Sequence, residues 1–183
     1  MKKKILIVGG TGFIGYHLAK ICLKKNFLVT SLSFGKPKKE RYLKKVKYIK
    51  CDISNKNNLK RNIKGNFDYV VNLGGYVNHN EKVKTLNSHY EGCKNLADFF
   101  RKKNIISFIQ IGSSVEYGPI KSPQSETQNC SIKKIKSTYG KAKFLATKYL
   151  LGLFEKERFP VTILRLYLVY GPNQDPNRLI SSV

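Results

Sequence analysis

At 183 residues, 41% of them hydrophobic, the chain is long enough for one domain with a sizeable core, and no apolar run in it is long enough to span a bilayer. Its four cysteines lie far apart without a Cys-x-x-Cys pair, which argues against a zinc site and is typical of reduced thiols in the cytoplasm. The formal net charge of +24 would attract polyanions, but lysine carries most of it and is scattered over nearly every segment, which favours solvated surface lysines over a nucleic-acid-binding face.

Apolar, β-branched runs alternate with helical patterns along the chain. Strands are predicted at residues 4–9, 28–32, 46–51, 69–73, 106–111 and 161–167, helices at residues 13–25, 56–62, 83–103 and 138–158, and loops at residues 119–136 and 171–177. Continuous apolar strands separated by helices are typical of parallel strands covered on both faces. The expected fold class is therefore α/β, a doubly wound parallel sheet of about six strands (a Rossmann fold) with helices on both faces.

A glycine motif lies between the first predicted strand and the first predicted helix. Gly9, Gly12 and Gly15 follow the spacing Gly-x-x-Gly-x-x-Gly. In this context one glycine permits unusual backbone angles, one lets the backbone approach a pyrophosphate, and one lets helix and strand pack closely. The alternative is merely a tight strand-to-helix turn, but the spacing and context favour a dinucleotide site at the helix N-terminus.

The second predicted strand ends without an acidic residue. Many dinucleotide-binding folds have a carboxylate there that accepts hydrogen bonds from the adenosine ribose, whereas this strand runs into Ser33 and then Lys36, Lys38, Lys39 and Arg41. No carboxylate would repel a 2′-phosphate and several cations could attract one, so the sequence favours NADP(H) over NAD(H). The alternative is that these cations are only part of the general lysine excess.

Three further motifs lie later in the chain: Ile-Gly-Ser-Ser-Val-Glu-Tyr-Gly at residues 111–118, Tyr-Gly-Lys-Ala-Lys at residues 139–143, and Leu-Arg-Leu-Tyr-Leu-Val-Tyr-Gly-Pro at residues 164–172. In this order, and together with the N-terminal glycines, they resemble the extended short-chain dehydrogenase/reductases, the NAD-dependent epimerase/dehydratase family of nucleotide-sugar enzymes. The resemblance runs along essentially the whole chain. It implies an NAD(P)-dependent enzyme that reduces a 4-keto nucleotide deoxysugar or epimerises it, in surface polysaccharide synthesis.

The resemblance also implies a set of cofactor contacts. Asp52 and Ile53 match the family's adenine-contacting pair, Leu73-Gly74-Gly75 matches a Leu-Ala-Ala segment beside the cofactor, and His89 replaces a usual asparagine. The expected cofactor-binding residues are Gly9, Gly12, Phe13, Ile14, Gly15, Ser33, Lys36, Asp52, Ile53, Leu73, Gly74, Gly75, Tyr139, Lys143 and Tyr167.

Ser113, Tyr139 and Lys143 match the family's catalytic triad. A free tyrosine phenol has a pKa of about 10, too high for an efficient proton shuttle at neutral pH. Lys143, one helical turn later, is expected to lower the pKa of Tyr139 and to hold the cofactor ribose, while Ser113 hydrogen-bonds the reacting oxygen. The alternatives are a helical tyrosine beside a solvated lysine, and Ser114 in the role of Ser113.

Departures from the family pattern reduce the number of reactions that fit the sequence. Dehydratases of the family carry a carboxylate one or two places after the position of Ser113, where this chain has Ser114 and Val115. Glu116 is the only nearby carboxylate and is out of phase with Val115, so a 4,6-dehydratase is less favoured than a reductase or epimerase. Leu168 replaces an asparagine that usually reaches substrate.

A second interpretation belongs to a different class: a non-catalytic NAD(P)-binding module whose basic face binds an acidic partner or nucleic acid. The presence of Ser113, Tyr139 and Lys143 favours the enzyme, because a sensor need not keep all three. Since family members are considerably longer, we expect that residues 1–183 form a truncated NAD(P)-binding domain without the C-terminal substrate domain. The resemblance further implies a homodimer, with the helices at residues 83–103 and 139–158 paired in a four-helix bundle.

Overall fold

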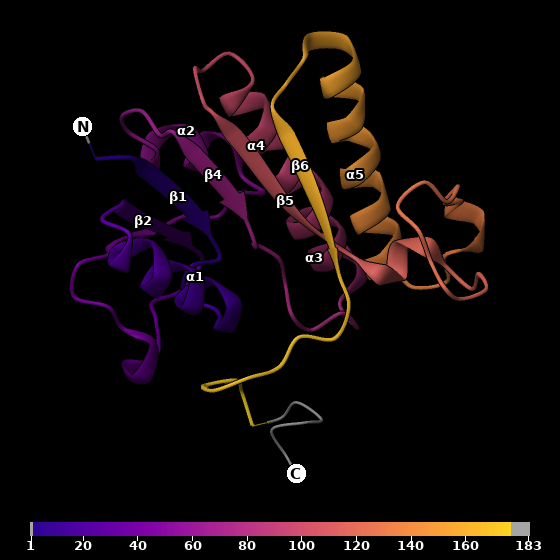
Figure 1. Cartoon of the computed structure of the whole chain (residues 1–183), viewed down its shortest axis with the longest axis horizontal. Helices are drawn as coiled ribbons and strands as arrows, with labels where there is room; N and C mark the ends of the chain where they lie inside the picture. The colour runs from indigo at the N-terminus through magenta and orange to yellow at the C-terminus, as the bar shows by residue number, and fades with distance from the viewer. Residues whose placement is uncertain (1, 177–183) are drawn as a thin grey trace.

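The computed structural model describes residues 2–176 and contains one six-stranded sheet in the order β3-β2-β1-β4-β5-β6, with every neighbouring pair parallel (Figure 1). The strands are β1 (Lys4–Val8), β2 (Leu28–Ser33), β3 (Lys47–Lys50), β4 (Tyr69–Asn72), β5 (Ser107–Ser113) and β6 (Val161–Leu166). The helices are α1 (Phe13–Lys24), α2 (Lys56–Asn62), α3 (Lys82–Leu86), α4 (Gly92–Phe100) and α5 (Thr138–Glu157). The expected doubly wound parallel sheet is confirmed.

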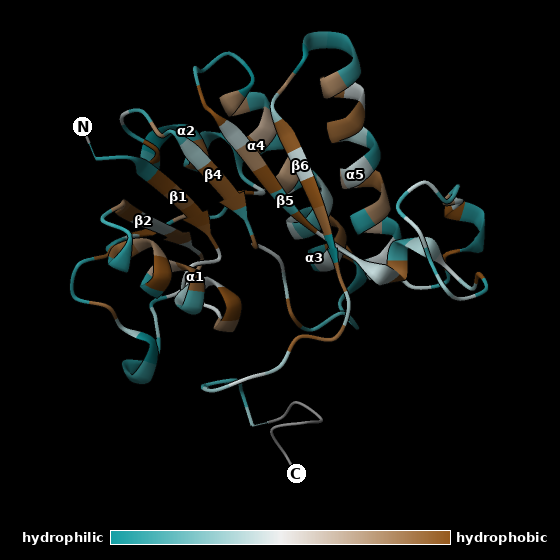
Figure 2. Cartoon of the chain, viewed as in Figure 1, coloured by the Kyte–Doolittle hydropathy of each residue, from teal (hydrophilic) through white to brown (hydrophobic). Residues whose placement is uncertain are grey.

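Apolar side chains alternate between the two faces of the sheet and form two cores. On one face Leu6, Val70 and Phe108 pack against α2, α4 and α5. On the other face Ile7 and Val71 pack against α1. Figure 2 shows hydrophobic colour concentrated along the central strands and on the inner sides of the helices. This burial on both faces explains why the strands read as continuous apolar runs rather than as alternating patterns.

Most element ends lie within one or two residues of the predicted ends, and local backbone geometry sets several of them. β1 stops at Val8 because Gly9 has a φ of +80°, which a strand cannot continue through. β5 extends to Ser113, which pairs with Leu166 of β6. α5 ends where Arg158 adopts a left-handed conformation.

The helix predicted at residues 83–103 is one helical segment with an irregular centre. A π-helical turn, η2 (Asn87–Glu91), separates α3 from α4, and the helix ends at Phe100. A π turn inserts an extra residue into a helical turn and often lies at functional sites. Here it contains His89, whose side chain is buried.

The face of the sheet that α1 covers is less protected at β5 and β6. Leu164 of β6 lies beside Ile111 of β5 on that face, and Leu164 is 43% exposed. Within the described residues no helix has the length and apolar character to cross a membrane, and no group of three potential metal ligands occurs.

Candidate active site

The carboxyl ends of all six parallel strands meet at one edge of the sheet. The strand order reverses direction between β1 and β4, and ligands of doubly wound folds bind outside the strand ends at such a point. The glycine motif follows β1, the Leu73–Gly75 segment follows β4, and Ser33 and Ser113 end β2 and β5. The topology thus brings most of the predicted site residues to one edge.

The glycine motif forms a tight turn that leaves little room for side chains. The amide of Gly9 donates to the carbonyl oxygen of Leu32 at 2.8 Å, and that of Gly12 donates to the carbonyl oxygen of Gly9 at 3.0 Å. A Cβ on Gly15 would lie 2.4 Å from the carbonyl oxygen of Gly9. A Cβ on Gly10 would lie 2.5 Å from the hydroxyl of Ser31, so Gly10, which the motif does not include, is also required for this packing.

The N-terminus of α1 fits an anionic group. Gly12 is its N-cap, none of the described side chains caps it, and its first turn contains no acidic residue. Among the described residues, a Cβ on Gly12 would meet only the carbonyl oxygen of Gly9 within 4 Å, at 3.3 Å, so the space beside Gly12 is open. Phe13 and Ile14, the first residues of α1, are half-buried. Unpaired N–H groups beside an open glycine surface suit the pyrophosphate of a dinucleotide.

Ser33 is tied to the glycine turn rather than turned outward. Its side-chain oxygen lies 3.3 Å from the amide nitrogen of Thr11, which donates to it, and Ser33 is buried. Lys36 is exposed. The cations that follow, Lys38 and Arg41, contact Asp175, a residue that the sequence analysis did not single out.

The segments after β3 and β4 pack against each other. The Asp52 carboxylate accepts hydrogen bonds from the amide and the hydroxyl of Ser54, at 2.9 and 2.7 Å. Ile53 lies beneath Gly74 and Gly92, where a Cβ on either glycine would approach it to 3.2 and 2.7 Å. Gly74 donates to the Asn72 side chain at 3.1 Å. The close packing explains why Gly74 stands where the family usually has alanine.

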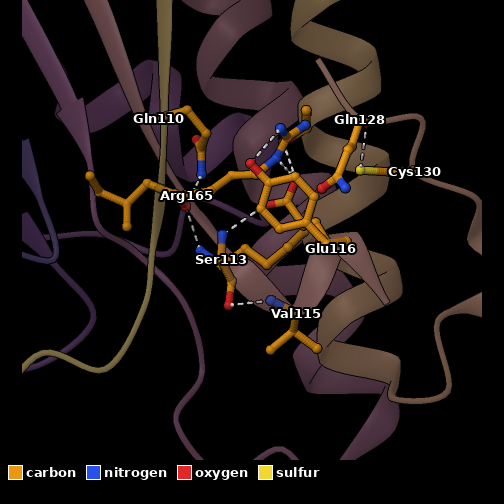
Figure 3. Close-up of polar contacts among 11 residues, drawn as sticks. Gln110, Ser113, Val115, Glu116, Gln128, Cys130 and Arg165 are labelled. Atoms are coloured by element: carbon orange, nitrogen blue, oxygen red, sulfur yellow. Dashed lines mark hydrogen bonds and ion pairs between the residues drawn. The ribbon is translucent and has the colours of Figure 1, made fainter. Parts of the chain in front are cut away.

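Ser113 lies at the edge of a buried polar network (Figure 3). Its amide donates to Glu116 at 2.7 Å, and its hydroxyl accepts from the amide of Val115 at 3.4 Å. Glu116 is fully buried, accepts a hydrogen bond from Thr147 at 2.7 Å, and pairs with Arg165 at 3.2 Å. The Glu116 carboxylate therefore has all its contacts inside the protein, and its hydrogen bond with the Ser113 amide helps to fix the position of Ser113.

Tyr139 and Lys143 lie one turn apart on α5 and face the same edge. The Lys143 ammonium is buried, lies 5.7 Å from the centroid of the Tyr139 ring, and donates to the carbonyl oxygen of Ile111 at 2.7 Å. Ser113 is close enough to Tyr139 for its hydroxyl to lower the pKa of the phenol by hydrogen bonding. The structure thus brings Ser113, Tyr139 and Lys143 together.

The expected depression of the Tyr139 pKa is not found. Burial raises the pKa of the Tyr139 phenol, and the hydrogen bond from Ser113 only opposes that rise. Burial also lowers the pKa of Lys143 to about 8. The lysine is therefore only partly charged in mildly alkaline solution, which limits how much its charge can favour a phenolate.

Two histidines surround Tyr139. The ring of His79, from the loop after β4, stacks on the Tyr139 ring with centroids 4.1 Å apart and planes at 13°. His89 of the π turn meets the Tyr139 ring edge-on at 5.0 Å. Burial lowers the pKa of His89 to about 3, so His89 is neutral; its Nδ1 has no hydrogen-bond partner among the described residues. His89 stood out in the sequence as a replacement for asparagine, whereas His79, a lone histidine in a loop, gave no signal.

Other expected residues lie apart from this group. Tyr167 follows β6, is exposed, and donates its hydroxyl to Gln124 at 2.6 Å, so its contact with a cofactor stays a prediction. Leu168 is exposed as well. Ser114 begins a 3₁₀ turn, η3 (Ser114–Tyr117), and Val115 is 42% exposed.

Comparisons with known proteins find relatives along nearly the whole chain. The chain is 29% identical over 184 residues to a UDP-N-acetyl-alpha-D-glucosaminuronate decarboxylase from Bacillus cytotoxicus, covering 94% of this chain and 56% of that protein. It is also 29% identical to a putative UDP-glucose 4-epimerase from Methanocaldococcus jannaschii, covering 94% of this chain and 58% of that protein. The chain therefore spans little more than half the length of these relatives.

Solved structures share the fold. A UDP-glucose 4-epimerase from Thermotoga maritima, solved with UDP-glucose, superposes with a TM-score of 0.85 at 24% identity, over 96% of this chain and 59% of that one. The Thermus thermophilus UDP-glucose 4-epimerase in complex with NAD has a TM-score of 0.83 at 23% identity, over 97% and 59% of the two chains. The sequence model of the NAD dependent epimerase/dehydratase family matches residues 5–183. Because that match covers nearly the whole chain, the protein belongs to the NAD dependent epimerase/dehydratase family.

Proposed function

We propose that this chain is the NAD(P)-binding and catalytic part of a nucleotide-sugar epimerase or reductase, acting by 4-keto reduction or epimerisation of a nucleotide deoxysugar in surface polysaccharide synthesis. The observation that carries the proposal is the convergence of Ser113, Tyr139 and Lys143 at the sheet edge that also holds the open glycine turn. Two relatives, a UDP-N-acetyl-alpha-D-glucosaminuronate decarboxylase and a putative UDP-glucose 4-epimerase, support a nucleotide-sugar substrate.

The cofactor would be held by the residues of the glycine turn and of the neighbouring strand ends. The first-turn amides of α1 would bind the pyrophosphate, and the Leu73–Gly75 segment and Lys143 would line the nicotinamide side. When bound, the nicotinamide supplies hydride transfer to or from a sugar carbon.

The side chains of the triad would handle the proton at the sugar oxygen. The Tyr139 phenol, with its raised pKa, is protonated at neutral pH and can donate its proton to a carbonyl oxygen that becomes an alcohol. Ser113 would hydrogen-bond the same oxygen and fix its position. In the oxidative direction Tyr139 must lose its proton, and the neighbouring Lys143 ammonium would stabilise the phenolate.

A dehydratase is less well supported. Elimination of water needs a carboxylate that faces the sugar, but the two residues after Ser113 are Ser114 and the partly exposed Val115. Glu116 is fully buried and bonded to Thr147 and Arg165, so its carboxylate cannot reach a substrate without breaking that network.

NADP(H) is our preferred cofactor, because Ser33 leaves no carboxylate at the end of β2 to repel a 2′-phosphate. A homodimer is part of the proposal, through the outer surfaces of α4 and α5. The buried face of α5 is used by the core, which leaves Leu151 and Phe154 as its exposed apolar residues. A cytoplasmic location stays a prediction.

The experiment compares the parent chain with Tyr139→Phe. Calorimetric titration should show NADPH binding to both proteins with affinities equal within about twofold, because the phenol oxygen is not a main binding group. With a 4-keto nucleotide sugar, the rate of NADPH oxidation should be lower in the variant by a factor of about 10² to 10⁴, the usual contribution of a general acid. Equal rates in the two proteins would contradict the role of Tyr139 as the proton donor. Failure of both NADPH and NADH to bind the parent chain would contradict the whole proposal.

A further inference from the structure

The segment after β6, residues 167–175, crosses the carboxyl edge of the sheet; we name it the strap. Figure 1 shows it in yellow, passing from the end of β6 below the sheet toward the side of α1. The carbonyl oxygen of Pro172 lies 2.8 Å from Nε2 of His17 on α1. A Cβ on Gly171 would lie 3.5 Å from the ring of Phe13, in the first turn of α1. The strap therefore borders the glycine turn proposed to hold the pyrophosphate.

The strap also binds the connection between β2 and β3. The guanidinium of Arg41 donates two hydrogen bonds to the carbonyl oxygen of Asn173, at 3.1 and 2.7 Å. Oδ1 of Asp175 accepts from Arg41 at 3.0 Å and from Lys38 at 2.6 Å. Arg41 is only 4% exposed, so its partners hold it in a defined position. Hydrogen bonds from Lys38 lower the pKa of the Asp175 carboxyl, with Arg41 adding to the effect, so Asp175 is ionised at neutral pH.

These two cations follow the strand end where a dinucleotide's adenosine ribose is recognised. Ser33 ends β2 and its hydroxyl accepts from Thr11 in the glycine turn, which links the start of the β2–β3 connection to the phosphate side of the site. In doubly wound folds a cation near this point accommodates a 2′-phosphate. Here Lys38 and Arg41 share the carboxylate of Asp175, which comes from a distant part of the chain.

We propose that Asp175 is a specificity-determining residue for the dinucleotide, because it occupies the two cations that would otherwise attract a 2′-phosphate. The inference rests on the proposed function, since it needs the dinucleotide site. Asp175 weakens the preference for NADPH that Ser33 and Lys36 create, and it leaves the affinity for NADH nearly unchanged. The strap, which lies outside the β2–β3 connection, thus reduces the preference for NADPH over NADH.

The test measures binding to the parent chain and to Asp175→Asn by calorimetry at moderate salt, with no turnover needed. The ligands are NADPH and NADH, together with 2′,5′-ADP and 5′-AMP, which carry only the adenosine half. Loss of the carboxylate should tighten NADPH and 2′,5′-ADP by about threefold to tenfold, the range of a partly exposed ion pair, and should change NADH and 5′-AMP by less than about twofold.

Two variants control for net charge and for the named partners. Asp68→Asn adds the same unit of charge at the opposite edge of the sheet, where Asp68 pairs with Lys3 at 3.5 Å, and it should leave all four affinities unchanged. The double variant with Lys38→Gln and Asp175→Asn should lose much of the gain in affinity for NADPH and 2′,5′-ADP that Asp175→Asn alone produces.

The outcomes separate the inference from the proposed function. Equal changes for all four ligands, or no change with Asp175→Asn while the parent binds NADPH, would overturn the role of Asp175 and leave the dinucleotide site standing. Failure of the parent to bind any of the four would overturn the proposed function and the inference with it.

Discussion

The strands β1, β2 and β4, here called the first half of the sheet, and the strands β5 and β6, called the second half, differ in how far the described chain covers them. In the first half both faces are buried, one beneath α1 and the other beneath α2 and α4, and the glycine turn is held by backbone hydrogen bonds. In the second half α5 covers one face, while Leu164 on the other is 43% exposed. The residues just after β6, among them Leu168 and Tyr170, are also exposed.

The difference in coverage suggests different expectations for cofactor binding and for turnover of a substrate. The first half, which we propose binds the dinucleotide and call the dinucleotide half, contains the glycine turn, the N-terminus of α1 and the packing that supports them, so we expect it to bind cofactor. The side chains that we propose as catalytic, Ser113, Tyr139 and Lys143, lie on β5 and α5, in the less covered half. We therefore expect dinucleotide binding together with slow turnover of a nucleotide sugar by this chain alone.

The largest effect is expected from a substitution that breaks the dinucleotide half. Gly15→Ala would place a Cβ 2.4 Å from the Gly9 carbonyl oxygen, so the backbone must shift, and the free energy of unfolding should fall by about 3 kcal/mol. Gly12→Ala has more room, with its nearest contact at 3.3 Å, and should cost under about 1 kcal/mol while weakening NADPH binding at least tenfold. Denaturant melts and calorimetry check both; equal stability losses would mean that the two glycines share one role.

The next effect concerns Lys143, a buried residue of α5 in the less covered half. Burial lowers the folded-state pKa of Lys143 to about 8, below its ordinary value of 10.5, so between these pH values the unfolded chain binds more protons and stability should rise with pH. Lys143→Met should remove this rise and, after loss of the hydrogen bond to Ile111, stabilise the protein at pH 7 by about 2 kcal/mol. Lys148→Met, on an exposed position of α5, is the matched control. If Lys143→Met is less stable than the parent at pH 7, burial of the Lys143 charge does not destabilise the folded protein as we expect.

The fold could be predicted because each strand is continuously apolar and each turn has its own residue signal. Gly9 and Gly15 predicted the first turn, and their positions in the structure explain why no other residue fits there. The π turn was not predictable, because it changes the hydrogen bonding of a helix without changing its apolar pattern. The end of β5 at Ser113 depends on pairing with β6, which a local pattern cannot contain.

The candidate site was predictable where motifs of fixed spacing carry it, and not where distant segments meet. Tyr139 and Lys143 are one helical turn apart, so their shared face follows from sequence. The contact of Asp175 with Arg41 joins residues 134 positions apart, and the stack of His79 on Tyr139 joins a loop to a helix. The raised pKa of Tyr139 was also missed, because burial of the phenol depends on packing that the sequence does not specify locally.

A smaller effect is expected on the relative affinities of the dinucleotide half for NADPH and NADH. The parent should bind NADPH more tightly than NADH. Ser33→Asp should reverse the order by about tenfold, because a carboxylate there repels a 2′-phosphate and can accept hydrogen bonds from a ribose hydroxyl. The new carboxylate can still accept from Thr11, so the turn should persist. Ser33→Asn is the neutral control, and equal NADPH and NADH affinities in the parent would contradict the preference.

The smallest expected effect is on self-association, and it tests which face of the second half, the one covered by α5 or the one that carries Leu164, forms the contact. If α4 and α5 pair across a two-fold axis, Phe154→Ser on α5 should weaken the dimer by about fivefold, since a single exposed aromatic contributes about 1 kcal/mol at such a surface. Leu164→Ser on β6 is equally exposed and should have no effect.

Charge should make this dimer unusually sensitive to salt. Each chain carries a formal net charge of +24, so two copies repel each other, and added salt should tighten the dimer by screening that repulsion. Light scattering across a series of salt and protein concentrations measures the association for the parent and both variants. A monomer under every condition would rule out the dimer. Weakening by Leu164→Ser instead of Phe154→Ser would place the contact on the face of β5 and β6 that α5 does not cover, and copies of this chain would then cover for each other the surface that the described residues leave exposed.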